Sequence, residues 1–175
     1  EEGLIMAFKS GFITVIGRPN VGKSTLVNRI VNEKISIISD KPQTTRNTIK
    51  TIITGPDSQI ILIDTPGIHR PKNKLGEYMV NVAKATLNEV DLVIYIVEAT
   101  EPNPGPVEKD IVSQLKDIKT PIILVINKID LVKKEQILSV INTYSKMLNF
   151  LHIIPVSALK NEGIDILLEI ERASC

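Results

Sequence analysis

The sequence has almost no cysteine and almost no net charge. Its one cysteine, Cys175, is the last of 175 residues, so it has no disulfide partner within the chain, as is typical of proteins from a reducing cytoplasm. Lysine and arginine total 21 against 20 for aspartate and glutamate, a net charge of +1 that argues against a wholesale electrostatic grip on nucleic acid or membrane. No apolar run approaches the roughly 20 residues that span a bilayer. The chain opens with Glu1 and Glu2, not with the basic start of a signal peptide.

The length and composition that remain are those of one folded domain. Hydrophobic residues make up 43% and charged residues 23%, which excludes intrinsic disorder as the main state. At roughly 100–200 residues per domain, the chain holds one domain with short tails. We expect an N-terminal tail at residues 1–7, ahead of or around a candidate native start at Met6, one domain at 8–172, and a C-terminal tail at 173–175.

Short apolar runs alternate with amphipathic ones along the chain. Strands are expected at 12–16, 49–54, 59–64, 92–97, 122–126 and 153–156, and helices at 21–31, 78–90, around 107–115, at 135–148 and at 164–170. The turn residues at 55–58 predict an antiparallel hairpin. The pattern predicts an α/β, doubly wound, mostly parallel six-stranded sheet with one antiparallel edge strand and helices on both faces. In such sheets the ligand lies beyond the carboxyl ends of the strands.

A phosphate loop follows the first expected strand. The motif G-x-x-x-x-G-K-[ST] is matched by Gly17, Arg18, Pro19, Asn20, Val21, Gly22, Lys23 and Ser24, with Thr25 next. Backbone N–H groups of such a loop and the helix that follows it favour phosphate. Lys23 is expected to reach the β- and γ-phosphates, and the Ser24 hydroxyl to bind Mg²⁺. A chance glycine-rich turn is the alternative, and the strand-to-helix context disfavours it.

A second polar motif ends the strand expected at 59–64. Asp64 is followed by Thr65, Pro66 and Gly67. An aspartate there can hold a Mg²⁺-bound water, and the Gly67 N–H can reach the γ-phosphate. By itself this pattern usually marks a turn, so its value comes from its position after the phosphate loop.

A third motif, Asn127-Lys128-Ile129-Asp130, follows the strand expected at 122–126. An aspartate can accept two hydrogen bonds, and guanine offers two adjacent donors, its N1–H and its amino group. Adenine would leave the Asp130 carboxylate unpaired, so an ATPase is disfavoured. The Lys128 stem can lie along the base. The alternative is a polar loop, which such residues often form.

In this order, the motifs resemble those of the translation-factor-related GTPases, over roughly residues 12–172. The resemblance implies that Ser157-Ala158-Leu159 is the fifth motif of that class, with the Ala158 N–H at the guanine O6. Lys41 to Arg46 and Asp64 to His69 are similar to the Era-type family of bacterial ribosome-assembly GTPases. By that resemblance Thr45, in preference to Thr44, is the switch I threonine that adds a Mg²⁺ ligand when GTP is bound.

The resemblance implies GTP or GDP as ligand, Mg²⁺ held by Ser24, Thr45 and Asp64, and a switch formed by residues 42–47 and 67–76. It implies as partners the small ribosomal subunit and its 16S rRNA, reached mainly through a KH domain, together with a peripheral, membrane-associated fraction of a cytoplasmic protein. A KH domain needs a G-x-x-G loop, and no two glycines here are three apart, so that domain is expected to be absent from this chain.

Two departures from the family pattern bear on catalysis. Ile68 stands where Ras-like GTPases carry a water-orienting glutamine, so slow intrinsic hydrolysis is expected with Lys23, Thr45, Gly67 and Asn20 as the catalytic set. Asn20 either coordinates K⁺ beside the phosphates, as in some relatives, or only shapes the loop. The other departure is Glu98, where relatives often carry aspartate, and we expect little consequence from it.

Two other functions stay open from the sequence. One is a nucleotide-dependent binding module with incidental hydrolysis, which Ile68 favours slightly. The other is a related tRNA-modification or ribosome-assembly GTPase, which the Pro42-Gln43-Thr44-Thr45 stretch disfavours.

Overall fold

The computed structural model describes residues 9–33, 48–54, 58–64 and 85–174, and all structural statements below concern these residues. Six strands are present: β1 (Lys9–Ile16), β2 (Thr48–Thr54), β3 (Ser58–Asp64), β4 (Leu92–Glu98), β5 (Ile122–Asn127) and β6 (His152–Pro155). The helices are α1 (Lys23–Glu33), α3 (Pro106–Leu115), α4 (Lys134–Ser145), α5 (Ile164–Ser174) and the short 3₁₀ helix η1 (Ile129–Leu131). Residues 85–89 are also helical.

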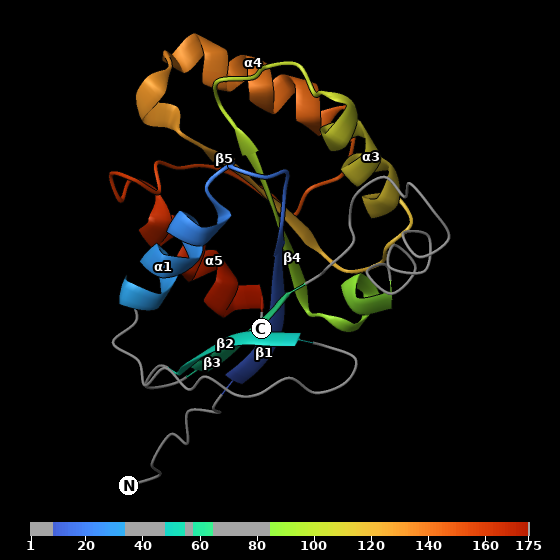
Figure 1. The fold of residues 1–175 in the computed structure, drawn as a ribbon, viewed down its shortest axis with the longest axis vertical. Helices are drawn as coiled ribbons and strands as arrows, with labels where there is room; N and C mark the ends of the chain where they lie inside the picture. Colours follow the sequence, from blue (N-terminus) through green and yellow to red (C-terminus); the bar gives the residue numbers. More distant parts are fainter. Residues whose placement is uncertain (1–8, 34–47, 55–57, 65–84, 175) are drawn as a thin grey trace, which may run out of the picture.

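The strands form one sheet in the order β2-β3-β1-β4-β5-β6 (Figure 1). Strands β1, β3, β4, β5 and β6 run parallel to one another, whereas β2 pairs antiparallel with β3 at the edge. The predicted six-stranded sheet with one antiparallel edge strand is therefore confirmed. Because the parallel strands all end at one edge, the loops after β1, β4 and β5 meet there.

Strands β4 and β5 are buried on both faces, which is why they read as nearly continuous hydrophobic runs. In β4, Leu92, Ile94 and Ile96 pack into one core cluster. Val93, Tyr95 and Val97 pack into the cluster on the other face. Successive side chains of a strand point to opposite faces, so a sheet covered on both sides needs apolar residues at every position.

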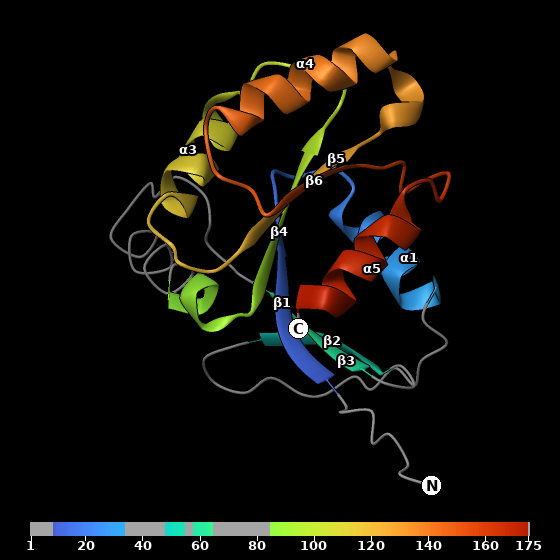
Figure 2. The ribbon, with the colours of Figure 1, turned by 180° about the vertical axis from the view of Figure 1, so that it is seen from behind.

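Helices cover both faces of the sheet. Leu26 and Ile30 of α1 and Leu167 of α5 pack on one face, and Figures 1 and 2 show these two helices side by side. Ile111 of α3 and Val140 of α4 pack on the opposite face. A three-layer α/β domain results, with the site edge at the carboxyl ends of the strands.

Helix α4 ends three residues earlier than the sequence predicts. It stops at Ser145, because the N–H groups of Met147 and Leu148 both donate to the Tyr144 carbonyl, at 2.9 and 3.3 Å, and turn the chain. Leu148 still packs on the same core cluster as α4. That contact explains why the apolar periodicity continued past the helix end.

Helix α5 is longer than predicted and runs to Ser174, so it includes residues assigned from the sequence to the C-terminal tail. Of the helix predicted at 78–90, only residues 85–89 lie in the described part, where they are helical. The N-terminal tail at 1–7 lies outside the described residues.

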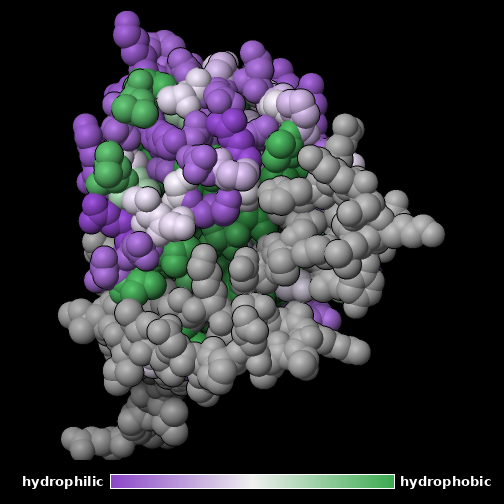
Figure 3. All heavy atoms as spheres, in the orientation of Figure 1, coloured by the Kyte–Doolittle hydropathy of each residue, from purple (hydrophilic) through white to green (hydrophobic). Residues whose placement is uncertain are grey.

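In the orientation of Figure 1, the coloured surface is mostly hydrophilic, with an apolar area in the middle of the view and separate apolar side chains elsewhere (Figure 3). Leu138 of α4, for example, is 63% exposed, and isolated exposed residues of this kind are ordinary. Among the described residues, no helix combines the length and the apolar character needed to cross a membrane.

Candidate functional site

The phosphate loop connects β1 to α1, as the sequence predicts. Lys23 opens the helix, and its ammonium donates to the carbonyls of Gly17 and Arg18, each at 2.7 Å. Asn20 adopts a left-handed backbone with φ of 64°. The lysine therefore folds back over the loop that precedes it and fixes the loop's curvature, with its charge at the centre of the curve.

Gly22 is required by the loop geometry. Its φ is +103°, a conformation that residues with a side chain rarely adopt, and a Cβ there would collide with the Asn127 side-chain nitrogen. The loop after β5 thus lies directly against the phosphate loop.

Asn127 ties three segments of the chain together. Its side-chain Nδ2 donates to the Val21 carbonyl at 2.9 Å, and its Oδ1 accepts from the Ala158 N–H at 3.0 Å. The residue is 3% exposed, so both bonds are shielded from water and satisfy a buried amide. From the family resemblance, the Ala158 N–H is expected to donate to the guanine O6. It already donates to Asn127 Oδ1, so a bound base would be a second acceptor for the same N–H.

Asp130 faces the same loop from the next turn. The Ser157 hydroxyl donates to Asp130 Oδ1 at 2.7 Å, and the Lys160 N–H donates to Ser157 Oγ at 3.1 Å. One carboxylate oxygen is thereby oriented by the protein, and the carboxylate keeps further acceptor capacity for a ligand.

A cavity of about 260 Å³ lies between these loops. Its lining residues are Gly22, Thr25, Asn127, Lys128, Asp130, Leu131 and Leu159. Leu131 and Leu159 are 65% and 70% exposed, so two apolar side chains flank the mouth of a cavity with a carboxylate inside it. An apolar cleft with a few polar groups is typical of a site for a flat organic ring.

Lys128, in the loop that follows β5, extends its side chain to the phosphate loop. Its backbone is left-handed, with φ of 66°, and its ammonium donates to the Asn20 carbonyl at 3.0 Å and to the Glu98 carboxylate. Lys128 is also one of the residues that line the cavity.

Glu98, which stands where relatives often carry aspartate, lies at the centre of a hydrogen-bond network. Its carboxylate receives Lys128, Arg18 Nη2 at 2.9 Å and the Thr100 hydroxyl at 3.0 Å. Burial alone would raise the pKa of Glu98. The hydrogen bonds from Lys128 and Thr100 and the charges of Lys128 and Arg18 outweigh that effect and lower the pKa below its usual value. Glu98 is therefore ionised and links both loops.

Three carboxylates surround the Arg18 guanidinium. Besides Glu98, its Nη2 lies 2.8 Å from Glu101 Oε1, and its Nε lies 3.1 Å from Glu108 Oε1. The Nε–H lacks hydrogen-bond alignment toward Glu108, so that contact is electrostatic. Arg18, predicted as a ligand residue, therefore offers a phosphate only its backbone N–H.

Arg29 supports the site, although no sequence motif indicates it. This α1 residue donates from Nε to the Ala158 carbonyl at 2.8 Å and from Nη2 to the Leu159 carbonyl at 2.7 Å. A guanidinium matches two such acceptors with its rigid fork. The partners are about 130 residues apart in the chain, so no local sequence signal could have revealed the contact.

We expect Arg29→Gln to loosen the loop at 157–160. Because two charge-assisted bonds are lost, each worth about 1.5–3 kcal/mol before solvent screening, amide hydrogen exchange in this loop should become at least about tenfold faster. Mass-spectrometric exchange measures it, with Asn28→Ala, on an exposed α1 position, as the matched control. Equal exchange in parent and Arg29→Gln would contradict the role.

The structure gathers most of the predicted site residues at one place. Phosphate-loop residues, the Asn127–Asp130 motif and the Ser157–Leu159 motif all surround the cavity or its support. Ser24 and Thr25 are exposed on the first turn of α1. Asp64 is the last residue of β3, which runs parallel to β1, so its backbone reaches the same edge. Thr45, Gly67, Ile68 and both switch segments lie outside the described residues.

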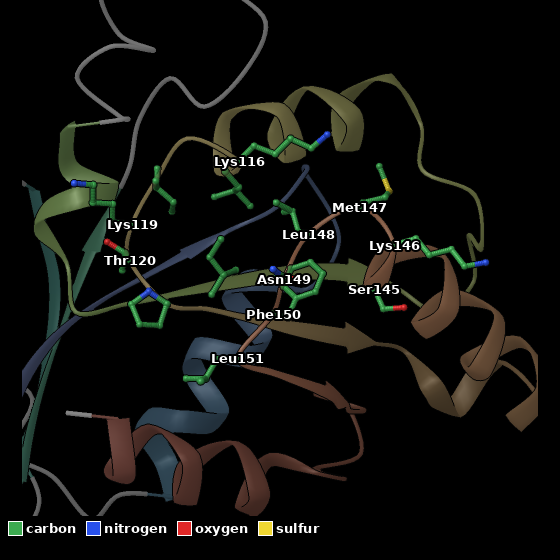
Figure 4. A pocket seen from close by; sticks show the side chains of 14 residues that line it. Lys116, Lys119, Thr120, Ser145, Lys146, Met147, Leu148, Asn149, Phe150 and Leu151 are labelled. Atoms are coloured by element: carbon green, nitrogen blue, oxygen red, sulfur yellow. The ribbon is translucent and has the colours of Figure 1, made fainter.

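A larger groove of about 610 Å³ lies at the other end of the sheet (Figure 4). It is lined by the ends of α3 and α4 and by the segments that lead into β5 and β6. Its lysines, Lys116, Lys119 and Lys146, extend in different directions and not toward one point (Figure 4). None of the predicted site residues lies there, so size alone does not mark the functional site.

Residues 12–128 match the sequence family described as 50S ribosome-binding GTPase. Among curated proteins, GTPase Era of Ruminiclostridium cellulolyticum is 60% identical over 164 residues, and GTPase Era of Caldicellulosiruptor saccharolyticus is 58% identical over 164 residues. Each alignment covers 94% of this chain but 55% of the relative. The chain therefore spans about half the length of these relatives.

Solved structures give the same likeness. A crystal structure of Era in complex with MgGDPNP and nucleotides 1506–1542 of 16S ribosomal RNA superposes with a TM-score of 0.75 at 38% identity, covering 95% of this chain and 57% of that one. The FeoB G-domain from Methanococcus jannaschii superposes with a TM-score of 0.63 at 26% identity, covering 95% of this chain and 97% of that one.

Proposed function

Because this chain belongs to the 50S ribosome-binding GTPase family, we propose that it is the G domain of an Era-type switch that binds GTP and GDP and hydrolyses GTP. One observation carries the proposal: Asn127 bonds the phosphate loop through Val21 and the Ser157–Leu159 loop through Ala158. The phosphate-binding and base-binding motifs are thereby held around one cavity. Such an arrangement suits a ligand with a phosphate chain at one end and a purine at the other.

The described residues fit a Mg²⁺–nucleotide complex. Lys23 already places its ammonium at the centre of the phosphate loop, where it donates to the carbonyls of Gly17 and Arg18, and phosphate oxygens can join these acceptors. The exposed Ser24 hydroxyl would hold Mg²⁺, with Asp64 through a water and Thr45 in the GTP state. The ion would neutralise charge that develops on the phosphates during hydrolysis.

Catalysis in this proposal depends on charge and positioning and not on a water-orienting side chain. Lys23 and the Gly67 N–H would stabilise the γ-phosphate, and Ile68 offers the attacking water no hydrogen bond. Arg18 cannot serve as an arginine finger in cis, because Glu98, Glu101 and Glu108 surround its guanidinium. A K⁺ ion at Asn20 would supply the missing positive charge.

We expect K⁺ to accelerate hydrolysis at least about tenfold over Na⁺, and Asn20→Ala to remove the difference, since its side-chain oxygen would be a K⁺ ligand. Single-turnover GTP hydrolysis in the two salts measures this. Asn28→Ala is the control for an exposed asparagine away from the loop. Identical rates in both salts would eliminate the ion, and a K⁺ effect that survives Asn20→Ala would place the ion elsewhere.

The partners follow from the relatives and not from the charge of this chain. The Era structure that matches at 38% identity holds a 16S rRNA fragment, which supports a role in small-subunit assembly for the protein to which this G domain belongs. With a net charge of +1, the domain is expected to bind RNA weakly by itself, so we assign RNA contact mainly to a KH domain.

We place the protein in the cytoplasm with a peripheral membrane-associated fraction. Flotation of the full-length protein with vesicles tests this.

Nucleotide preference tests the proposal directly. The chain should bind GDP at least about a hundredfold more tightly than ADP, because adenine leaves the Asp130 carboxylate without donors, and should release phosphate from GTP with Mg²⁺ present. Equal affinity for GDP and ADP would reject the assignment. Single-turnover hydrolysis with and without small ribosomal subunits separates a regulated GTPase from a binding module with incidental hydrolysis.

A further inference from the structure

The carboxylate of Glu98 lies between the two loops that form the candidate cavity. Glu98 is the last residue of β4, beside β5 in the sheet, and its register partner is Asn127. Its Oε1 accepts from Lys128 in the loop that follows β5, and its Oε2 accepts from Arg18 of the phosphate loop. The side chain is only 10% exposed, so these pairs are weakly screened by solvent.

We infer that Glu98 is a positioning residue for the purine site: it holds the Lys128 side chain across the phosphate loop so that the lysine stem forms a fixed wall of the cavity. This inference rests on the proposed function and names a residue that the family motifs do not include. Glu98 itself does not line the cavity, so it would act through Lys128.

The need for such a group comes from the lysine. A lysine has four rotatable bonds, and ordering it costs up to about 2 kcal/mol of side-chain entropy. Its two anchors are the Asn20 carbonyl and the Glu98 carboxylate, and among the described residues Glu98 is its one ion-pair partner. Without the carboxylate, the ammonium keeps one neutral acceptor and gains access to water, so the stem is no longer fixed.

The network also supplies a matched control. Glu101 pairs with the same Arg18 at 2.8 Å, is half exposed, and makes no ion pair with Lys128. Changing Glu101 to glutamine removes the same charge from the same cluster while leaving the Lys128 anchor intact. A general electrostatic or structural effect would appear in both variants, whereas a positioning effect appears only at Glu98.

The first experiment uses nucleotide-free protein and acetic anhydride as a lysine-selective probe. Glu98→Gln should raise the rate of Lys128 acetylation by about threefold or more relative to the parent, read by peptide mass spectrometry, with exposed Lys109 as an internal reference. Glu101→Gln should match the parent. An unchanged Lys128 rate in Glu98→Gln would overturn the inference, whatever the chain binds.

The second experiment measures GDP, IDP and ADP affinities of the same variants. Glu98→Gln should bind GDP roughly tenfold more weakly than the parent. This is the effect of losing about one charge-assisted hydrogen bond, the bond that positions Lys128. The GDP-to-IDP ratio should stay as in the parent, because that ratio reports the Asp130 contact with the guanine amino group. GDP affinity equal to that of the parent, or an equal loss in Glu101→Gln, would overturn the inference.

Glu98→Asp keeps the charge and tests the geometry should Glu98→Gln fold poorly. Its shorter side chain cannot reach both Lys128 and Arg18 as Glu98 does, so acetylation and GDP affinity should fall between parent and Glu98→Gln. Parental behaviour of this variant in both assays would overturn the inference. If the parent shows no preference for GDP over ADP, the proposed function fails. The acetylation rate still tests whether Glu98 fixes the Lys128 side chain.

Discussion

Asp130→Asn should shift the base preference from guanine to xanthine and leave the phosphate contacts intact. Guanine presents N1–H and amino donors to a carboxylate, whereas xanthine has a carbonyl in place of the amino group. An amide in place of the carboxylate offers one acceptor and one donor, which match xanthine. Each charge-assisted bond is worth about 1.5–3 kcal/mol, so the ratio of GTP to xanthosine triphosphate affinity should change by at least about tenfold to a hundredfold.

The structure explains why Asp130→Asn should leave the surrounding loop unchanged. Ser157 Oγ donates to Asp130 Oδ1 at 2.7 Å, and an amide oxygen can accept the same bond. Keeping that bond orients the amide nitrogen away from Ser157 and leaves it free to donate to a base. The loop is therefore expected to keep its shape in the variant.

Competition binding of the two triphosphates to parent and variant measures the effect. Glu135→Gln, on an exposed residue in the first turn of α4, is the control for loss of one carboxylate near this loop. If Asp130 only stabilises the loop, both nucleotides will weaken alike. An unchanged ratio would remove Asp130 from the base site and reopen the ATPase alternative.

Lys23→Ala should reduce the affinity for GTP by at least about a hundredfold. Its ammonium donates to two carbonyls of the phosphate loop, whereas the Arg18 guanidinium is bound to carboxylates and the Lys128 ammonium is paired with Glu98. Losing two charge-assisted bonds of about 1.5 kcal/mol each accounts for a hundredfold weakening. Isothermal titration with GTP and GDP measures it.

The variant also tests whether Lys23 is needed for the fold. The ammonium donates to the carbonyls of Gly17 and Arg18 in a surface loop where water can replace it, so a shift of no more than about 1 kcal/mol in unfolding free energy is expected. Lys109→Ala, on an exposed position of α3, removes an equal charge away from the cavity and should bind GTP as the parent does. Tight GTP binding by Lys23→Ala would reject the phosphate-loop assignment.

The strands and their order of appearance were predictable from the sequence because their signal is local. Runs such as 92–97 and 122–126 are apolar at every position, and runs this short suit a strand covered on both faces. The end of α4 was not predictable, because Leu148 keeps the helical spacing while packing from beyond the helix. Periodicity reports which side chains are buried and not where the backbone turns.

The site, too, was predictable in its local motifs but not in its long-range contacts. By itself the sequence determined where the phosphate-loop motif and the Asn127–Asp130 motif lie and the edge of the sheet where they meet, since each is a short run with a fixed place after a strand. Only the tertiary structure decided what holds them: Asn127 bonding Val21 and Ala158, Arg29 bonding the last loop, and Glu98 joining Arg18 to Lys128. These contacts join residues 30 to about 130 positions apart. Their partners are chosen by how the strands are ordered in the sheet, which no local pattern records.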